Sequence, residues 1–100
     1  MVKVVIRTSA KRNLKSIMRY IARDNPKRAY SFTLELETVC YSLAELPLQG
    51  RLIPKLGTNI RRLVHGNYSV YYRLDENKHT VFILRITEQH QDQSRILFED

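Results

Sequence analysis

The spacing of apolar residues predicts a strand and two helices in the first half of the chain. The segment Val2 to Arg7 is β-branched, and Thr8-Ser9 after it is typical of a helix start. A first helix is expected from about Ala10 to Asp24, because its apolar residues recur at intervals of three and four and form one stripe: Leu14, Ile17, Met18 and Ile21. Asp24-Asn25-Pro26 then ends this helix and begins another.

The second helix is expected from about Pro26 to Leu46, since Pro47 cannot continue it. Its apolar residues also share one face: Ala29, Phe32, Leu36, Val39, Cys40 and Leu43. Both apolar stripes must be buried against another apolar surface for the helices to be stable, which indicates a helical hairpin packed on a sheet. The segment Leu48 to Asn59 has little periodicity and is expected to be an irregular connection.

Alternating residues in the second half predict an antiparallel meander. Gly66-Asn67 suits a type II′ turn, and pairing outward from it sets Arg62 opposite Tyr71. With Asp75 to His79 as the next loop, Tyr72 would face Phe82 and Val70 would face Leu84. One face would then cover the helices: Leu63, Tyr68, Val70, Tyr72, Leu74, Phe82, Leu84 and Ile86. The other would have no helical layer: Arg62, Val64, Tyr71, Arg73, Val81, Ile83 and Arg85.

These patterns predict an α+β fold, with an N-terminal strand and a helical hairpin packed on a C-terminal antiparallel meander, and one domain over residues 1–100. A net charge of +7 favours an acidic partner, either a protein or, secondarily, nucleic acid. The single cysteine, Cys40, excludes an internal disulfide. No signal peptide or membrane helix is apparent, so we expect a soluble cytoplasmic protein without membrane contact.

Two clusters of charge are candidate binding sites. Arg62, Tyr71, Arg73 and Arg85 would form a basic, aromatic surface for an anionic partner, or a plain solvated sheet face. Lys15, Arg19 and Arg23, with Arg12 beside them, place like charges four residues apart on the first helix. An acidic partner would relieve that repulsion, although a solvated ridge is an equal alternative.

A third candidate lies on the second helix, opposite its core stripe. Either the segment Leu48 to Asn59 wraps over Tyr30, Leu34 and Tyr41, or these residues form a docking strip for another chain. Cys40, by contrast, belongs to the core stripe and is expected to be buried and unreactive.

Groups for catalysis are few. The sequence has no carboxylate pair, glycine-rich phosphate loop or metal-spaced cluster, so neither a metal nor a cofactor is expected. Of the histidines, His65 adjoins a turn and His79 lies in a loop, whereas His90 follows the last strand. His90 is the one histidine weighed as a catalytic candidate, and a polar tail residue is the favoured interpretation.

The chain resembles the RelE/ParE superfamily of toxins from bacterial type II toxin-antitoxin operons, most closely its ParE branch. The similarity covers nearly the whole chain and rests on the order of several short segments: Tyr20 to Pro26, Leu46-Pro47 with Gly50-Arg51, Arg61 to Tyr68, Tyr71 to Arg73, and Ile83 to Ile86. It implies a helical hairpin on an antiparallel sheet. It also implies an acidic antitoxin that wraps the toxin with a segment that folds on binding.

The two branches imply different targets. ParE-type toxins inhibit DNA gyrase by binding, without a chemical step of their own, whereas RelE-type toxins cut messenger RNA on the ribosome. At positions where the ribonuclease branch has two arginines and a tyrosine, this chain has Ser69, Gln89 and Arg95. His90 or Arg85 could substitute, so an endoribonuclease stays the alternative. The ParE pattern differs too, since its histidine-glycine pair falls on Glu88-Gln89.

Overall fold

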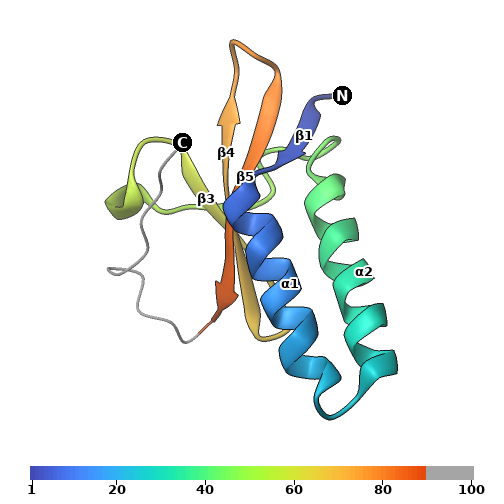
Figure 1. Ribbon diagram of the computed structural model, residues 1–100. Helices are drawn as coiled ribbons and strands as arrows, with labels where there is room; N and C mark the ends of the chain where they lie inside the picture. Colours follow the sequence, from blue (N-terminus) through green and yellow to red (C-terminus); the bar gives the residue numbers. More distant parts are fainter. Residues whose placement is uncertain (90–100) are drawn as a thin grey trace.

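A computed structural model describes residues 1–89 and shows two helices on one face of a five-stranded mixed sheet (Figure 1). The elements follow one another as β1 (Lys3–Ile6), α1 (Thr8–Ala22), α2 (Pro26–Ser42), β2 (Arg51–Leu52), a short 3-10 helix η1 (Pro54–Leu56), β3 (Ile60–His65), β4 (Tyr68–Asp75) and β5 (Thr80–Glu88). The strand order is β1-β5-β4-β3-β2, and only the β1–β5 pair is parallel. The predicted α+β fold is confirmed.

The helical hairpin has the expected position but different ends. α1 begins at Thr8, after Arg7 as its N-cap, whose side chain makes no capping hydrogen bond. At α2 the side chain of Asn25 accepts a hydrogen bond from the N–H of Arg28 at 3.0 Å, with Pro26 in the first turn. α2 ends at Ser42 rather than Leu46, and the backbone oxygen of Ala44 then accepts a bond from the N–H of Val2.

The main core lies between the helices and the sheet. It is formed by buried side chains from both helices, the C-cap of α2 and three strands: Ile6, Ala10, Leu14, Ile17, Phe32, Leu36, Cys40, Leu43, Tyr68, Val70, Tyr72, Val81, Ile83 and Ile86. Most of the two predicted stripes is therefore correct. Met18 is the exception, since 38% of its surface is exposed and it lies at the margin of the stripe.

The β3–β4 hairpin has the predicted register, with His65 paired to Tyr68 and Arg62 to Tyr71. Gly66 opens the turn with a φ of 59°, a conformation that glycine adopts without the steric cost of a Cβ.

The predicted register between β4 and β5 is wrong. Asp75 pairs with Thr80, so the loop is one residue shorter than expected, and a bulge between Tyr71 and Tyr72 shifts the register again. Tyr72 consequently pairs with Ile83 and Val70 with Ile86. Because side chains alternate with a period of two, the change moves Val81 and Ile83 to the helix face. Phe82 and Leu84 move to the other face.

The face away from the helices carries a small core of its own, contrary to expectation. Ile60, Tyr71 and Leu84 are buried there, with Leu56 of η1 and Phe82 packed against them. The segment predicted to be an irregular connection thus supplies β2, η1 and part of this cover. Within residues 1–89, neither helix has the length and apolar character needed to cross a bilayer.

Candidate partner-binding surfaces

The arginines predicted on the helix-free face do lie there. Arg62, Tyr71 and Arg85 form one row across β3, β4 and β5, and Arg73 lies two residues further along β4. All three arginines are partly exposed. Tyr71 is only 2% exposed, because the second core encloses it. Its ring is therefore buried and is not part of an exposed aromatic surface, contrary to the prediction.

The row extends to a residue that the sequence analysis missed. β2 places the exposed Arg51 directly opposite Arg62, and like charges at that position repel each other. Among residues 1–89, no carboxylate lies within ion-pair distance of either side chain. Arg51 was overlooked because a two-residue strand has too few residues for a periodic signal. We call Arg51, Arg62 and Arg85 the arginine row.

The outer face of the helical layer combines charge with apolar area. Arg12, Lys15, Arg19 and Arg23 are all exposed along α1, and we call them the basic ridge. On α2, Tyr30, Leu34 and Tyr41 are exposed by 66%, 47% and 53%, and we call them the apolar strip. The segment Leu48 to Asn59 therefore does not cover the strip, which removes one of the two predicted alternatives.

A groove of about 400 Å³ separates the ridge from the strip. Its lining is apolar at the bottom, from Ile6, Leu14 and Met18, and carries the two lysines of α1: Ile6, Lys11, Leu14, Lys15, Met18, Thr33, Glu37 and Tyr41. The exposure of Met18 follows from this position. The groove can accept a side chain that is apolar at its tip and carries negative charge nearby.

An ion-pair network joins α2 to the end of β3. The carboxylate of Glu35 accepts hydrogen bonds from Arg28 at 2.5 Å and from His65 at 3.0 Å. The hydrogen bonds from Arg28 and then His65 hold the pKa of Glu35 below its usual value. The centroid of the Phe32 ring lies 4.9 Å from the guanidinium carbon of Arg28 and 5.7 Å from the imidazole centroid of His65. The sequence analysis missed this network. Its one signal in the sequence is the spacing of Arg28 and Glu35, which lie two helical turns apart and therefore share one face of α2.

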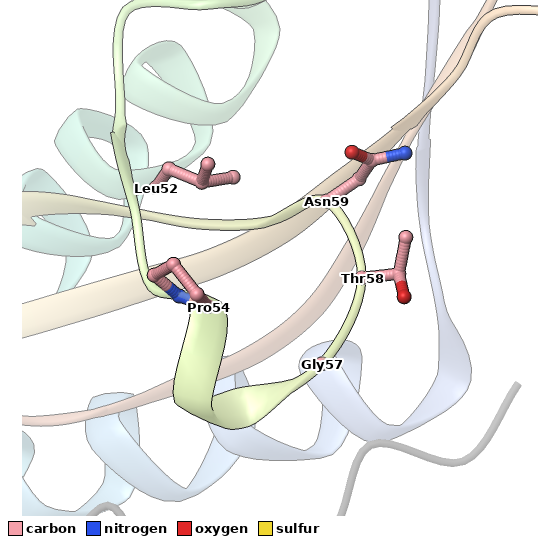
Figure 2. Close-up of a pocket in the computed structure, with 5 residues that line it drawn as sticks. All are labelled: Leu52, Pro54, Gly57, Thr58 and Asn59. Carbon is pink, nitrogen blue, oxygen red and sulfur yellow. The ribbon is translucent and has the colours of Figure 1, made fainter.

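A second hollow, of about 300 Å³, lies in the loop before β3. Figure 2 shows its lining residues, Leu52, Pro54, Gly57, Thr58 and Asn59, around the turn that follows η1. None of them is a titratable side chain, so this hollow offers no general acid, base or nucleophile.

The described residues contain little that could catalyse a reaction. Cys40 is fully buried, as expected, and burial raises the pKa of its thiol to about 12. Arg85 donates a hydrogen bond to the backbone oxygen of Leu84 at 2.8 Å. His79 is exposed in the β4–β5 loop, and His90, like Arg95, lies outside the described residues. Residues 1–89 contain no group of three metal-ligating side chains.

The solved structures that resemble this fold include those of three toxin-antitoxin systems. The toxin-antitoxin complex RelBE2 from Mycobacterium tuberculosis aligns at 26% identity and a TM-score of 0.67, covering 87% of this chain and 96% of that chain. The chromosomal ParDE system from P. aeruginosa aligns at 20% identity and a TM-score of 0.74, and the alignment covers 88% of this chain and 96% of that chain. The intact E. coli RelBE complex aligns at 10% identity and a TM-score of 0.66, and the alignment covers 91% of this chain and 100% of that chain. The last two likenesses concern the fold alone.

The sequence gives a more specific result than the fold. No curated protein sequence matches significantly. A family model described as the ParE toxin of the type II toxin-antitoxin system, parDE, nevertheless matches residues 4–93. That match spans both helices and the whole sheet, and it confirms the resemblance noted from short segments. The chain therefore belongs to the ParE toxin family of type II toxin-antitoxin systems, within the RelE/ParE superfamily.

Proposed function

We propose that this toxin inhibits DNA gyrase by binding to it and that an acidic cognate antitoxin neutralises it. The observation that carries the proposal is the match to the ParE toxin family over residues 4–93, since gyrase inhibition is the activity that the resemblance to the ParE branch implies. The basic charge of the chain, +7, supports an acidic neutralising partner.

The side chains that could take part in catalysis support inhibition by binding rather than by a chemical step. The thiol of Cys40 is buried, and His65 is engaged by Glu35. Ser69, which stands where the ribonuclease branch has an arginine, is fully buried and has a short neutral side chain. It therefore supplies no positive charge for a scissile phosphate.

The apolar strip of α2 and the groove beside it are the proposed antitoxin site. The M. tuberculosis RelBE2 and E. coli RelBE structures are toxin-antitoxin complexes, which supports an antitoxin for this chain also. The apolar strip offers Tyr30, Leu34 and Tyr41, while Lys11 at the groove offers positive charge. An amphipathic acidic segment would match both features.

A supercoiling assay with purified toxin and gyrase tests the proposal. Micromolar toxin should inhibit supercoiling or trap cleaved DNA-gyrase complexes, and preincubation with the antitoxin should restore the activity. Normal supercoiling without trapped complexes would reject gyrase as the target. Heat-inactivated toxin is the control for unspecific inhibition by a basic protein.

A ribosome-dependent endoribonuclease is the second candidate, and the arginine row favours it, because guanidinium groups can stabilise a phosphorane. Primer extension after toxin induction tests this activity. New messenger ends within codons would support it, and unchanged ends during growth arrest would eliminate it.

A further inference from the structure

α1 carries charge of only one sign. The helix contains four cationic residues, Lys11, Arg12, Lys15 and Arg19, and no acidic one. Arg7 and Arg23 add two more cations at its caps. Like charges four residues apart destabilise a helix, and cations in the first turn oppose the helix dipole. Nothing in the packing of the core requires this arrangement, because the buried residues of α1 are Ala10, Leu14 and Ile17.

The side of α1 opposite those buried residues has a uniform chemistry. All its side chains are exposed, and all are basic or hydroxylated: Thr8, Arg12, Lys15, Ser16, Arg19 and Arg23. Lysine, arginine, serine and threonine are among the side chains that contact phosphate oxygens in protein-DNA complexes. The acidic neighbours are few: Asp24 follows Arg23, and Glu37 lines the groove with Lys15. Neither forms an ion pair with the ridge within residues 1–89.

This face contrasts with that of the neighbouring helix. The outward residues of α2 include the apolar strip, whose rings and aliphatic group suit a protein partner. The basic ridge has no apolar side chain to bury, so a protein would gain little from covering it. Two parallel bands of the same helical layer thus offer different chemistry, one apolar and one cationic.

We propose that the basic ridge of α1 binds the phosphate backbone of duplex DNA. Residues Thr8 to Arg23 extend roughly 22 Å along the helix axis, which corresponds to about six phosphates of one strand of B-DNA. A duplex suits the ridge better than a single strand, whose binding relies on stacking between bases and exposed rings. The ridge residues themselves carry no ring, and Tyr20, which is 61% exposed, lies about 100° around the helix from Arg19.

Salt-dependent binding of DNA to the purified toxin tests this inference. Fluorescence anisotropy with a labelled 20-base-pair duplex, between 50 and 200 mM NaCl, should give a log-log slope of about −3.6 if the four ridge cations displace counterions. The affinity should fall by about a hundredfold over that range. Arg12→Gln with Arg19→Gln should reduce the slope to about −1.8.

The matched control removes the same charge from elsewhere. Lys27 on α2 and Lys55 on η1 are both exposed, so Lys27→Gln with Lys55→Gln should leave the slope unchanged. Equal losses in both double variants would overturn the proposal, as would no binding in 50 mM NaCl. Tighter binding to single-stranded RNA of the same length would overturn the assignment to duplex DNA. Thermal melts by circular dichroism verify that the variants fold.

The result is independent of the proposed function, because the assay contains no gyrase. A toxin that binds DNA through the ridge but leaves gyrase unaffected would support this inference and reject the other. If Arg12→Gln with Arg19→Gln abolished antitoxin binding and left DNA affinity intact, the ridge would be a protein interface and the inference would be wrong.

Discussion

The phenolic oxygen of Tyr72 accepts a hydrogen bond of 2.7 Å from the backbone N–H of Gly50, and both residues are buried. The bond fixes the chain that leaves α2 against the middle of β4. A Cβ at position 50 would lie 2.7 Å from the Tyr72 ring and 3.0 Å from the backbone oxygen of Arg62. Glycine is therefore required here by close approach rather than by an unusual φ.

Gly50→Ala should destabilise the toxin by about 1–3 kcal/mol, because the added methyl group overpacks a buried site. Denaturant unfolding measures the loss. Gly57→Ala is not a matched control, since its φ of 139° adds backbone strain. Gln49→Ala, at the exposed neighbouring residue, is the suitable one and should change stability little. Equal effects of the two substitutions would contradict the close contact.

Burial raises the pKa of Tyr72 above that of a free phenol, although its bond from Gly50 and the charge of Arg61 act in the opposite direction. A raised folded-state pKa means that stability is complete below the unfolded value of about 10 and falls as the pH rises through the folded value. Unfolding free energies measured between pH 8 and 11 should decline less in Tyr72→Phe. Parallel declines in both proteins would show that another group is responsible.

Asn13 of α1 acts as a hydrogen-bond partner for the sheet. Its side-chain oxygen accepts a bond from the backbone N–H of Ile86 at 2.9 Å, beyond the point where β1 stops pairing with β5. Asn13→Ala should cost about 1–3 kcal/mol by leaving that N–H unsatisfied. Amide hydrogen exchange at Ile86 should accelerate, whereas Asn77→Ala in the exposed loop should have no such effect.

The network around Glu35 predicts acid sensitivity. Because Arg28 and His65 lower the pKa of Glu35 in the folded chain, its stabilising effect is present above the unfolded pKa and is lost as the pH falls through the folded value. Between about pH 5 and pH 3, wild-type protein should lose more stability than Glu35→Gln. Glu45→Gln, at an exposed position, should behave as wild type.

The apolar strip makes a prediction about the antitoxin. Leu34→Asp introduces a charge at the centre of the strip, so antitoxin affinity should fall by at least about tenfold, measured by calorimetry. Leu34 is 47% exposed, so the fold should tolerate the change. Gln49→Asp adds the same charge at an exposed loop residue and should reduce affinity much less. Equal losses would indicate a general electrostatic effect.

The arginine row provides a separate test. Charge reversal at Arg62 or Arg85 should weaken antitoxin binding if an acidic segment also crosses the sheet. Arg51→Glu, directly opposite Arg62, should weaken it similarly, since both side chains would face the same segment. Unchanged affinity in all three variants would confine the antitoxin to the helical layer.

Local sequence patterns were sufficient for the helices and for the β3–β4 hairpin. Helices α1 and α2 are amphipathic, and Gly66 marks a two-residue turn. Residues close in sequence therefore determine the helical hairpin and the β3–β4 hairpin. The predicted β4–β5 register was wrong because the sequence shows neither the bulge nor the shorter loop. The β5 residues are apolar in succession, so their alternation gives no signal for either feature. Phe82 and Val81 are both apolar and fit either face.

The candidate surfaces were predicted less completely. The arginines and the apolar strip were found from charge and periodicity, but the burial of Tyr71 depends on Leu56, which comes from a segment without a periodic signal. The pairing of Arg51 with Arg62 and of Glu35 with His65 joins elements far apart in the sequence. Such contacts follow from the tertiary fold, which local propensity does not encode.

The parallel pairing of β1 with β5 has a consequence for synthesis on the ribosome. Residues 3–6 find their strand partner only when residues 80–83 have been translated and have left the exit tunnel. The nascent helices meanwhile lack β5, the strand against which α1 packs, and contacts of such sequence separation form slowly. A chain released before Thr80 would therefore have no closed sheet, so premature termination should yield unfolded product for proteolysis rather than a shortened active toxin.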